Sequence, residues 1–152
     1  LNNNYYSAWN YIIFVKGLSK FLPSKLTHYN GILYMYIPFT ARTSKSFLLT
    51  KDKEWETVGE GVKRKIMGYD DKIMLVHVAF DKGGIGPMHQ HHHSQVTHVV
   101  SGVFDVTIDG ETQTLRQGDN FYIPTNVLHG AICIEAGELI DVFSPIREDF
   151  ME

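Results

Sequence analysis

Short runs of β-forming residues, separated by glycine-containing turns, recur through the chain from Ser46 onward. Residues 75–80 have the sequence Leu-Val-His-Val-Ala-Phe, in which strand-favouring side chains predominate. Similar runs occupy residues 96–100, 104–108, 120–123, 131–134 and 139–143. Short strands at regular spacing with intervening turns predict an all-β fold, either a sandwich or a barrel.

Glycine-containing pairs between these runs predict where the strands reverse. Asp109-Gly110 is the strongest such prediction, because Asp and Gly tolerate the positive φ angles of a type I′ hairpin. Further turns are expected at residues 83–84, 86–87, 101–102, 118–119 and 136–137. No convincing helical pattern follows residue 46, apart from a short terminal turn expected over residues 147–152.

The first third of the chain differs in composition from the rest. Residues 1–46 contain five Lys or Arg and no Asp or Glu, and Asn, Tyr, Ile, Phe and Lys make up 22 of the 46. Because these five amino acids have AT-rich codons, one hypothesis is that this segment is translated upstream DNA. The alternative is a strand-bearing extension, since residues 32–39 have the composition of a strand. We therefore predict an N-terminal extension at residues 1–45 and one domain at residues 46–152.

Composition argues against several classes of protein. Cys133 is the only cysteine, so a disulfide within the chain and a multi-cysteine zinc site are both excluded. The formal net charge of -3 provides no reason to expect a nucleic-acid partner. No apolar run approaches the roughly 18–20 residues that span a bilayer. We expect a cytoplasmic protein that binds neither nucleic acid nor membrane.

Five histidines are concentrated in residues 87–98, between two predicted strands. An expression tag would lie at a terminus, and a solvated loop would not account for the spacing. His89, His91 and Gln95 share the same parity, so in extended backbone they project from one face. Imidazole nitrogens and an amide oxygen are suitable ligands for first-row divalent metals. This segment therefore predicts three ligands of a single metal site.

A fourth ligand must come from another part of the chain. His129 is the candidate, because it follows the turn predicted at residues 124–126 and begins a strand. His92 has the wrong parity, and His93 is expected on the wall or rim of the pocket. The remaining candidates are expected to be structural, as hydrogen-bonded histidines or a buried thiol: His77, His98 and Cys133.

Two segments resemble the two sequence motifs of the cupin family. Residues 84–102 resemble the first motif, with two histidines, a further ligand position and a glycine. Residues 118–129 resemble the second, a glycine followed by a proline and a histidine. Gln95 stands where most cupins have Glu, and Asn126 and Cys133 replace a glycine and an asparagine. The resemblance implies a jelly-roll β-barrel, the double-stranded β-helix, that holds one metal ion.

The C-terminal segment resembles a narrower group, the pectin-degradation cupins, which also have Gln at the position of Gln95. Residues 141–150 match the end of these proteins, and the resemblance extends over about residues 46–152. Those cupins open the ring of 4,5-unsaturated monouronates from pectin or alginate. The resemblance implies an isomerase-type, tautomerising metalloenzyme and a homodimer. It also implies that Asp141 moves a proton, Phe143 forms an apolar wall and Arg147 binds the substrate carboxylate.

Two alternatives remain open at this point. The chain could be another metal-dependent cupin enzyme, such as a dioxygenase, or a sugar-binding cupin without catalytic activity. Three imidazoles and an amide accept Ni, Zn, Mn, Fe or Co, so the ligands do not identify the divalent metal. The neutral Gln95 leaves the charge of the metal uncancelled, which suits a Lewis acid better than a redox centre.

Overall fold

The computed structural model describes residues 26–29, 32–35 and 42–151, which fall into two compact units, Leu1–Thr40 and Ala41–Glu152. Within the first unit, β1 (Leu26–Tyr29) and β2 (Ile32–Met35) form an antiparallel pair. The strand predicted at residues 32–39 is present as far as Met35, and its remainder lies outside the described residues. The domain boundary expected near residue 46 stays a prediction.

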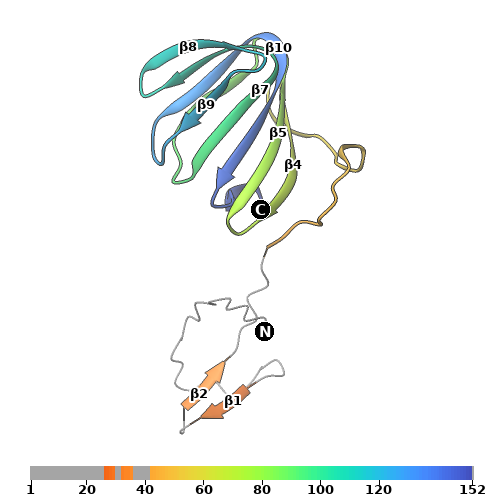
Figure 1. The fold of residues 1–152 in the computed structure, drawn as a ribbon, viewed down its shortest axis with the longest axis vertical. Coiled ribbons are helices and arrows are strands. Elements are labelled where there is room, and N and C mark those ends of the chain that lie inside the picture. Colours follow the sequence, from red (N-terminus) through yellow and green to blue (C-terminus); the bar gives the residue numbers. More distant parts are fainter. Residues whose placement is uncertain (1–25, 30–31, 36–41, 152) are drawn as a thin grey trace, which may run out of the picture. The chain divides into compact units, whose positions relative to one another are not determined.

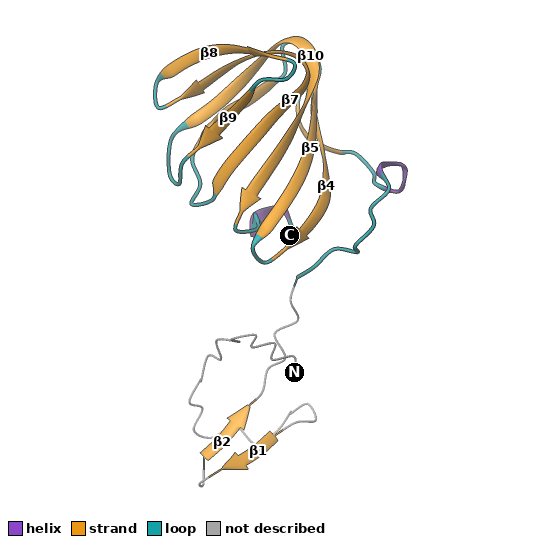
Figure 2. Cartoon of the chain, in the orientation of Figure 1, coloured by secondary structure: helices purple, strands orange, loops and turns teal. Residues whose placement is uncertain are grey.

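The second unit is built almost entirely of strands, which confirms the predicted all-β fold (Figure 2). Its two short 3-10 turns are η1 (Thr50–Asp52) and η2 (Glu148–Phe150), the latter at the predicted terminal turn. Among the described residues, no helix has the length and apolar character needed to cross a membrane. The strands are β3 (Glu56–Gly59), β4 (Val62–Asp70), β5 (Ile73–Phe80), β6 (Ile85–His89), β7 (Ser94–Ile108), β8 (Glu111–Arg116), β9 (Asn120–Ile123) and β10 (His129–Ser144).

These strands form one antiparallel sheet that curls around its own core (Figure 1). The order along the sheet is β3-β4-β5-β10-β7-β8, while β6 pairs with β10 and β9 pairs with β7. The long strand β10 therefore has two halves with different neighbours. Residues 129–132 pair with β6, and residues 137–143 pair with β5. As a result, His129 at the start of β10 lies between His89 at the end of β6 and Ile108 at the end of β7.

Alternating side chains from the central strands fill the interior. Strand β5 shows the pattern most clearly, because Met74, Val76, Val78 and Phe80 are buried on one face. A period of two residues is expected for a strand with one face on the core. Phe104 from β7 packs edge-on against Phe80 with ring centroids 5.4 Å apart. These side chains belong to one apolar core.

The predicted hairpin at residues 109–110 is confirmed. Asp109 and Gly110 both have positive φ angles, of 51° and 82°, and they connect β7 to β8. This is the conformation that a type I′ turn requires. Strands β3, β4 and β8 were not predicted, because their sequences are rich in charged and polar residues.

Three of the predicted turns are wrong, because the chain continues there as a strand. Residues 86–87 lie within β6, and residues 101–102 and 136–137 lie within the long strands β7 and β10. Gly102 (φ 84°) and Gly137 are needed for close approach, since a Cβ on Gly102 would lie 2.6 Å from the Cα of Gly137. The register between the paired strands β7 and β10 shifts near these two glycines. Glycines inside strands mark such bulges and contacts as well as turns.

Candidate metal centre and cavity

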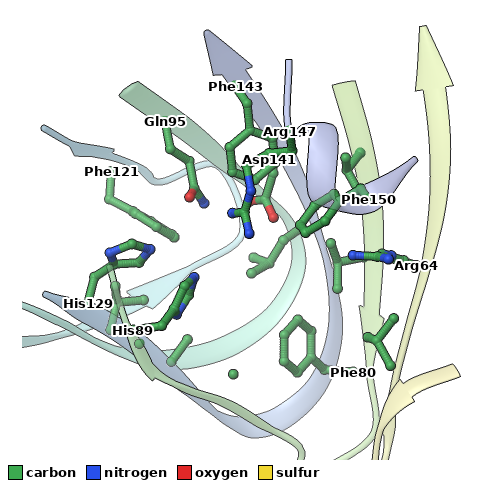
Figure 3. A pocket seen from close by; sticks show the side chains of 18 residues that line it. Arg64, Phe80, His89, Gln95, Phe121, His129, Asp141, Phe143, Arg147 and Phe150 are labelled. Carbon is green, nitrogen blue, oxygen red and sulfur yellow. The ribbon is translucent and has the colours of Figure 1, made fainter. Parts of the chain in front are cut away.

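A cavity of about 160 Å³ opens inside the curled sheet (Figure 3). Its lining includes six of the seven residues that the sequence singled out for function: His89, Gln95, His129, Asp141, Phe143 and Arg147. The seventh, His91, lines a neighbouring hollow that it shares with Arg147. Asp141 and Phe143 both face the cavity, as their common parity on one strand predicts. Figure 3 shows Asp141 and Arg147 next to each other, and His89 and His129 together at another part of the cavity.

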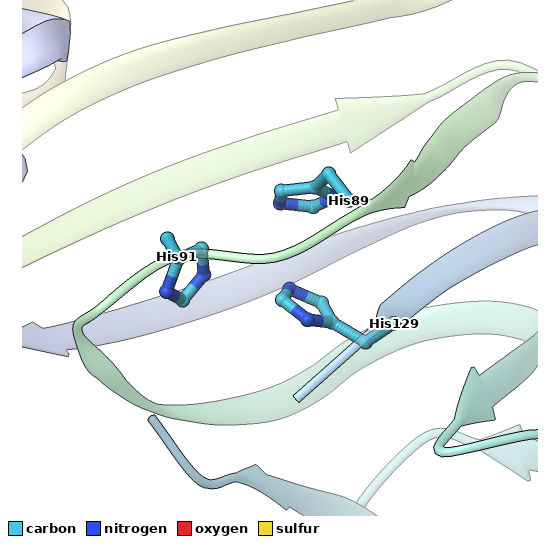
Figure 4. Close-up of side chains that lie close together, drawn as sticks. All are labelled: His89, His91 and His129. Atoms are coloured by element: carbon cyan, nitrogen blue, oxygen red, sulfur yellow. The ribbon is translucent and has the colours of Figure 1, made fainter. Parts of the chain in front are cut away.

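The side chains of His89, His91 and His129 lie close together (Figure 4). His89 is the last residue of β6, and His129 is the first of β10; the two are partners across these strands. Their ring centroids lie 4.3 Å apart, and the His91 ring lies 4.8 Å from that of His129. One ring nitrogen of each histidine lies within 4.8 Å of the other two. The three side chains could therefore hold one metal ion.

Each of these histidines has one ring nitrogen held by a backbone carbonyl. The contacts are His89 Nδ1 to Pro87 O (2.8 Å), His91 Nδ1 to His93 O (3.0 Å) and His129 Nδ1 to Val127 O (2.8 Å). Because a carbonyl oxygen only accepts hydrogen bonds, each Nδ1 carries the ring hydrogen. Each neutral ring then presents a lone pair at Nε2. Metal-binding histidines in proteins are oriented in this way.

Burial favours the neutral form of His91 and His129. It lowers the pKa of His91 to about 4, with the Arg147 charge as the next contribution, and it also lowers the pKa of His129. His129 is 4% exposed, and its Nε2 has no hydrogen-bond partner among the described residues. A buried lone pair without a partner is unfavourable. A divalent cation would satisfy this atom, so the donor set fits a metal.

Gln95 on β7 adds an oxygen to this set. Its Oε1 lies 3.1 Å from His91 Nε2, and its Nε2 donates a hydrogen bond of 2.9 Å to Thr97 Oγ1. When the His91 ring carries its hydrogen at Nδ1, His91 Nε2 and Gln95 Oε1 both present lone pairs and cannot hydrogen-bond to each other. A cation between them would bind both. Shared parity does not explain this position, because the chain bends at His92 and His93 before β7 begins.

Asp141 on β10 is the acidic group of the cavity. Its Oδ1 accepts a hydrogen bond of 2.6 Å from Thr97 Oγ1. Desolvation by burial raises the pKa of Asp141 to about 6, although hydrogen bonds from Thr97 and Gln95 and the Arg147 charge oppose this shift. A carboxyl group with a pKa in this range can both accept and release a proton near neutral pH.

Arg147 is 8% exposed and lies against the cavity wall. Its Nε and Nη2 donate to both carboxylate oxygens of Asp149, at 2.9 and 2.7 Å. This ion pair lowers the pKa of Asp149. The guanidinium carbon lies 4.1 Å from the ring centroid of Phe150 and 5.3 Å from that of Phe143. The pairing leaves both Nη1 hydrogens and one Nη2 hydrogen free to bind an anion.

His77, His98 and Cys133 have structural contacts, as predicted. His77 Nε2 lies 3.0 Å from a Glu138 carboxylate oxygen, and His98 Nδ1 lies 2.8 Å from Asn120 Oδ1. Cys133 is a buried thiol at 1% exposure. His93, which is 3% exposed, lies on the neighbouring hollow with its Nε2 3.4 Å from Glu148.

Three residues of this region were missed by the sequence analysis. Thr97 could have been found, because it lies two residues after Gln95 and so shares its face of the strand. Arg64 lines the cavity from β4, and its guanidinium carbon lies 3.9 Å from the Phe150 ring centroid. No local pattern predicts that Phe150 lies close to both Arg64 and Arg147.

Comparison with known proteins agrees with this fold. Residues 76–143 match the family model of the cupin domain. The curled all-β sheet with its cluster of histidines is thus a cupin fold, which confirms the predicted jelly-roll class. The chain is 41% identical over 109 residues to the pectin degradation protein KdgF of Dickeya dadantii (strain 3937), covering 70% of this chain and 99% of that protein. The chain belongs to the KdgF family of cupins.

Solved structures support the same assignment. An RmlC-like cupin from Shewanella frigidimarina NCIMB 400 is 46% identical, with a TM-score of 0.70 over 71% of this chain and 97% of that one. KdgF from Halomonas sp. is 39% identical, with a TM-score of 0.67 over 70% of this chain and 99% of that one.

Proposed function

We propose that this protein acts in pectin or alginate breakdown by opening the ring of 4,5-unsaturated monouronates. The observation that carries the proposal is the lining of one cavity. Asp141, Phe143 and Arg147 line the same cavity as His89 and His129, two of the histidines that could bind a metal ion. A non-catalytic sugar-binding cupin has no need of a proton-transfer group beside such donors. Family membership supports the substrate class, because the relatives from Dickeya dadantii and Halomonas are KdgF proteins.

The proposed ligands of one divalent ion, drawn from Ni, Zn, Mn, Fe or Co, are the three Nε2 atoms and one amide oxygen: His89, His91, His129 and Gln95. When bound, this ion supplies a Lewis acid that stabilises negative charge on a substrate oxygen. The chain's own part is to hold the four donor atoms close together. The carbonyl contacts to the three Nδ1 atoms fix the orientation of the rings.

The reaction requires one proton to leave the substrate and one to be added. The C1 hydroxyl of the hemiacetal loses its proton, the bond from C1 to the ring oxygen breaks, and C1 becomes an aldehyde. The ring oxygen retains that electron pair as an enolate on C5, and protonation at C4 gives the ketone. We assign both transfers to Asp141, which accepts the C1 hydroxyl proton and delivers a proton to C4. Its raised pKa, about 6, suits both directions of transfer.

Arg147 and Phe143 are assigned to substrate binding. The Nη1 and Nη2 hydrogens that Asp149 leaves free can hold the uronate carboxylate in a bidentate way. Phe143 is 3% exposed and provides an apolar surface beside the sugar ring. Both groups reduce the contact of the reacting atoms with water. A carboxylate held at Arg147 would place the sugar beside Asp141, because both residues line the same cavity.

The decisive experiment uses the full chain and 4,5-unsaturated galacturonate. We expect the ultraviolet absorbance of the conjugated double bond to disappear faster than in the spontaneous reaction. An unchanged rate would refute ring opening. Oxygen uptake in the same mixture would instead identify a dioxygenase. The homodimer and the cytoplasmic location are further proposals, which size-exclusion chromatography and cell fractionation would test.

A further inference from the structure

Thr97 connects the proposed metal ligand Gln95 with the proposed proton carrier Asp141. It is fully buried at 0% exposure, although it carries a hydroxyl group. Its Oγ1 accepts a hydrogen bond of 2.9 Å from Gln95 Nε2 and donates one of 2.6 Å to Asp141 Oδ1. Buried hydroxyl groups need partners of this kind, because removal from water is otherwise costly.

Strand geometry brings these three side chains together. Thr97 follows Gln95 by two residues on β7, so the two side chains lie on the same face. Asp141 on β10 is the direct partner of Thr97 across the antiparallel pair. Side chains in such partner positions have Cβ atoms about 5 Å apart, close enough for a hydrogen bond. The register of β7 and β10 therefore determines this contact.

The two hydrogen bonds run in a single direction. The hydroxyl hydrogen of Thr97 is used by the Asp141 carboxylate, so Thr97 Oγ1 can only accept from Gln95. The amide group must therefore turn its NH₂ toward Thr97, which leaves its oxygen facing His91 Nε2 at 3.1 Å. If the amide were reversed, the Gln95 oxygen would face Thr97 Oγ1, and both atoms would be acceptors. The Gln95 NH₂ group would then face the proposed metal ligand His91.

We infer that Thr97 is a positioning residue that orients the Gln95 oxygen toward the metal and fixes Oδ1 of Asp141. The inference rests on the proposed function, since it assumes that Gln95 is a ligand. Fixing Oδ1 also restricts rotation of the carboxyl group and leaves Oδ2 as the oxygen available to a bound molecule. One hydroxyl group thereby couples the geometry of the metal ligand to that of the proton carrier.

The test compares Thr97→Val, which has nearly the same shape but no hydroxyl, with Thr97→Ser, which retains the hydroxyl. The full chain is loaded with Co²⁺ alone, whose visible spectrum reports the number and type of its ligands, and Gln95→Ala serves as the reference for a lost amide. We expect Thr97→Val to weaken Co²⁺ binding about 10- to 100-fold, as loss of a supporting hydrogen bond does elsewhere. Its spectrum should approach that of Gln95→Ala, whereas Thr97→Ser should match the wild type.

The outcomes separate this inference from the proposed function. If only Gln95→Ala changes the spectrum, while Thr97→Val matches the wild type in spectrum and affinity, Thr97 is a packing residue and the inference is wrong. If Gln95→Ala also matches the wild type, the amide is not a ligand, and both the ligand set and the inference fail. Should Thr97→Val not fold, Thr97→Ala gives the same comparison without a branched side chain.

Discussion

His91 Nε2 and Gln95 Oε1 face each other at 3.1 Å, although both atoms present lone pairs. The His91 ring hydrogen is held at Nδ1 by the carbonyl of His93, and the Gln95 NH₂ is held by Thr97. Neither group can turn to donate to the other without losing a hydrogen bond. The arrangement is therefore unfavourable without a cation and favourable with one, which links metal binding to the stability of this end of the sheet.

Binding of a divalent metal to His129 Nε2 should increase the free energy of unfolding, because this buried atom has no hydrogen-bond partner among the described residues. At a metal concentration of 100 times the Kd, binding adds about 2.7 kcal/mol, which raises the Tm by on the order of 10 °C. We expect EDTA to remove this gain in the wild type, and His129→Ala to show a low Tm that EDTA does not change. His98→Ala is the matched control, since His98 contacts Asn120 outside the site. Differential scanning calorimetry with and without Zn²⁺ measures both effects, and an EDTA response retained in His129→Ala would contradict the prediction.

Replacing Gln95 by Glu should tighten metal binding but slow the reaction. A carboxylate adds a negative charge that attracts the ion and cancels part of its charge, so the Lewis acid weakens. Glu also cannot donate to Thr97, which loses the hydrogen bond now made at 2.9 Å. We expect kcat to fall on the order of tenfold, or about 1.4 kcal/mol in barrier. Isothermal titration with Zn²⁺ and the absorbance assay test the two parts, and a faster Gln95→Glu enzyme would refute the argument.

Asp141→Asn should abolish most of the activity while the metal remains bound. An amide keeps an oxygen that can accept from Thr97 but cannot carry the proton, and general acid–base catalysis contributes about 10²- to 10⁴-fold. Asp105→Asn is the control, because Asp105 accepts a hydrogen bond of the same length, 2.6 Å, from Thr114 outside the cavity. Equal kcat values in the two variants would exclude Asp141 from proton transfer.

Arg147→Lys should impair substrate binding more than the chemical step. Lys retains the charge but lacks the planar guanidinium group, which can donate to Asp149 and to a substrate carboxylate at the same time. Hydrogen bonds to charged groups contribute about 1.5–3 kcal/mol, so kcat/KM should fall roughly 10- to 100-fold, mainly through KM. The same exchange at the exposed Arg116 is the control. A normal KM in Arg147→Lys would remove the carboxylate-binding role.

Gly102→Ala should destabilise the fold far more than Gly110→Ala. The two glycines have nearly the same φ, 84° and 82°, so the strain from a positive φ is similar, about 1–2 kcal/mol. Only Gly102 is crowded, because its new Cβ would lie 2.6 Å from Gly137 Cα, whereas nothing lies within 4 Å at Gly110. We expect an additional loss of about 2 kcal/mol at Gly102 in urea unfolding. Equal losses of stability in the two variants would show that the backbone around Gly102 and Gly137 moves apart easily to make room for the new Cβ.

Local sequence patterns predicted much of the fold correctly. The run at residues 75–80 is within β5, and Asp109-Gly110 forms the expected hairpin. The patterns failed where glycine serves a contact between distant strands, as at Gly102 and Gly137. In sequence such a glycine looks the same as one in a turn, because both are glycines beside β-forming residues.

The candidate site divides in the same way. The sequence by itself determined the residue types of the proposed metal ligands and the common face of Asp141 and Phe143, because both depend on chemistry and on spacing along one strand. Only the tertiary structure decided that Thr97 meets Asp141, 44 residues away, and that Arg147 lines the same cavity as His89. Those contacts depend on the register between strands and on the path of the C-terminal segment. Register is set by the packing of the whole sheet, which no short stretch of sequence contains.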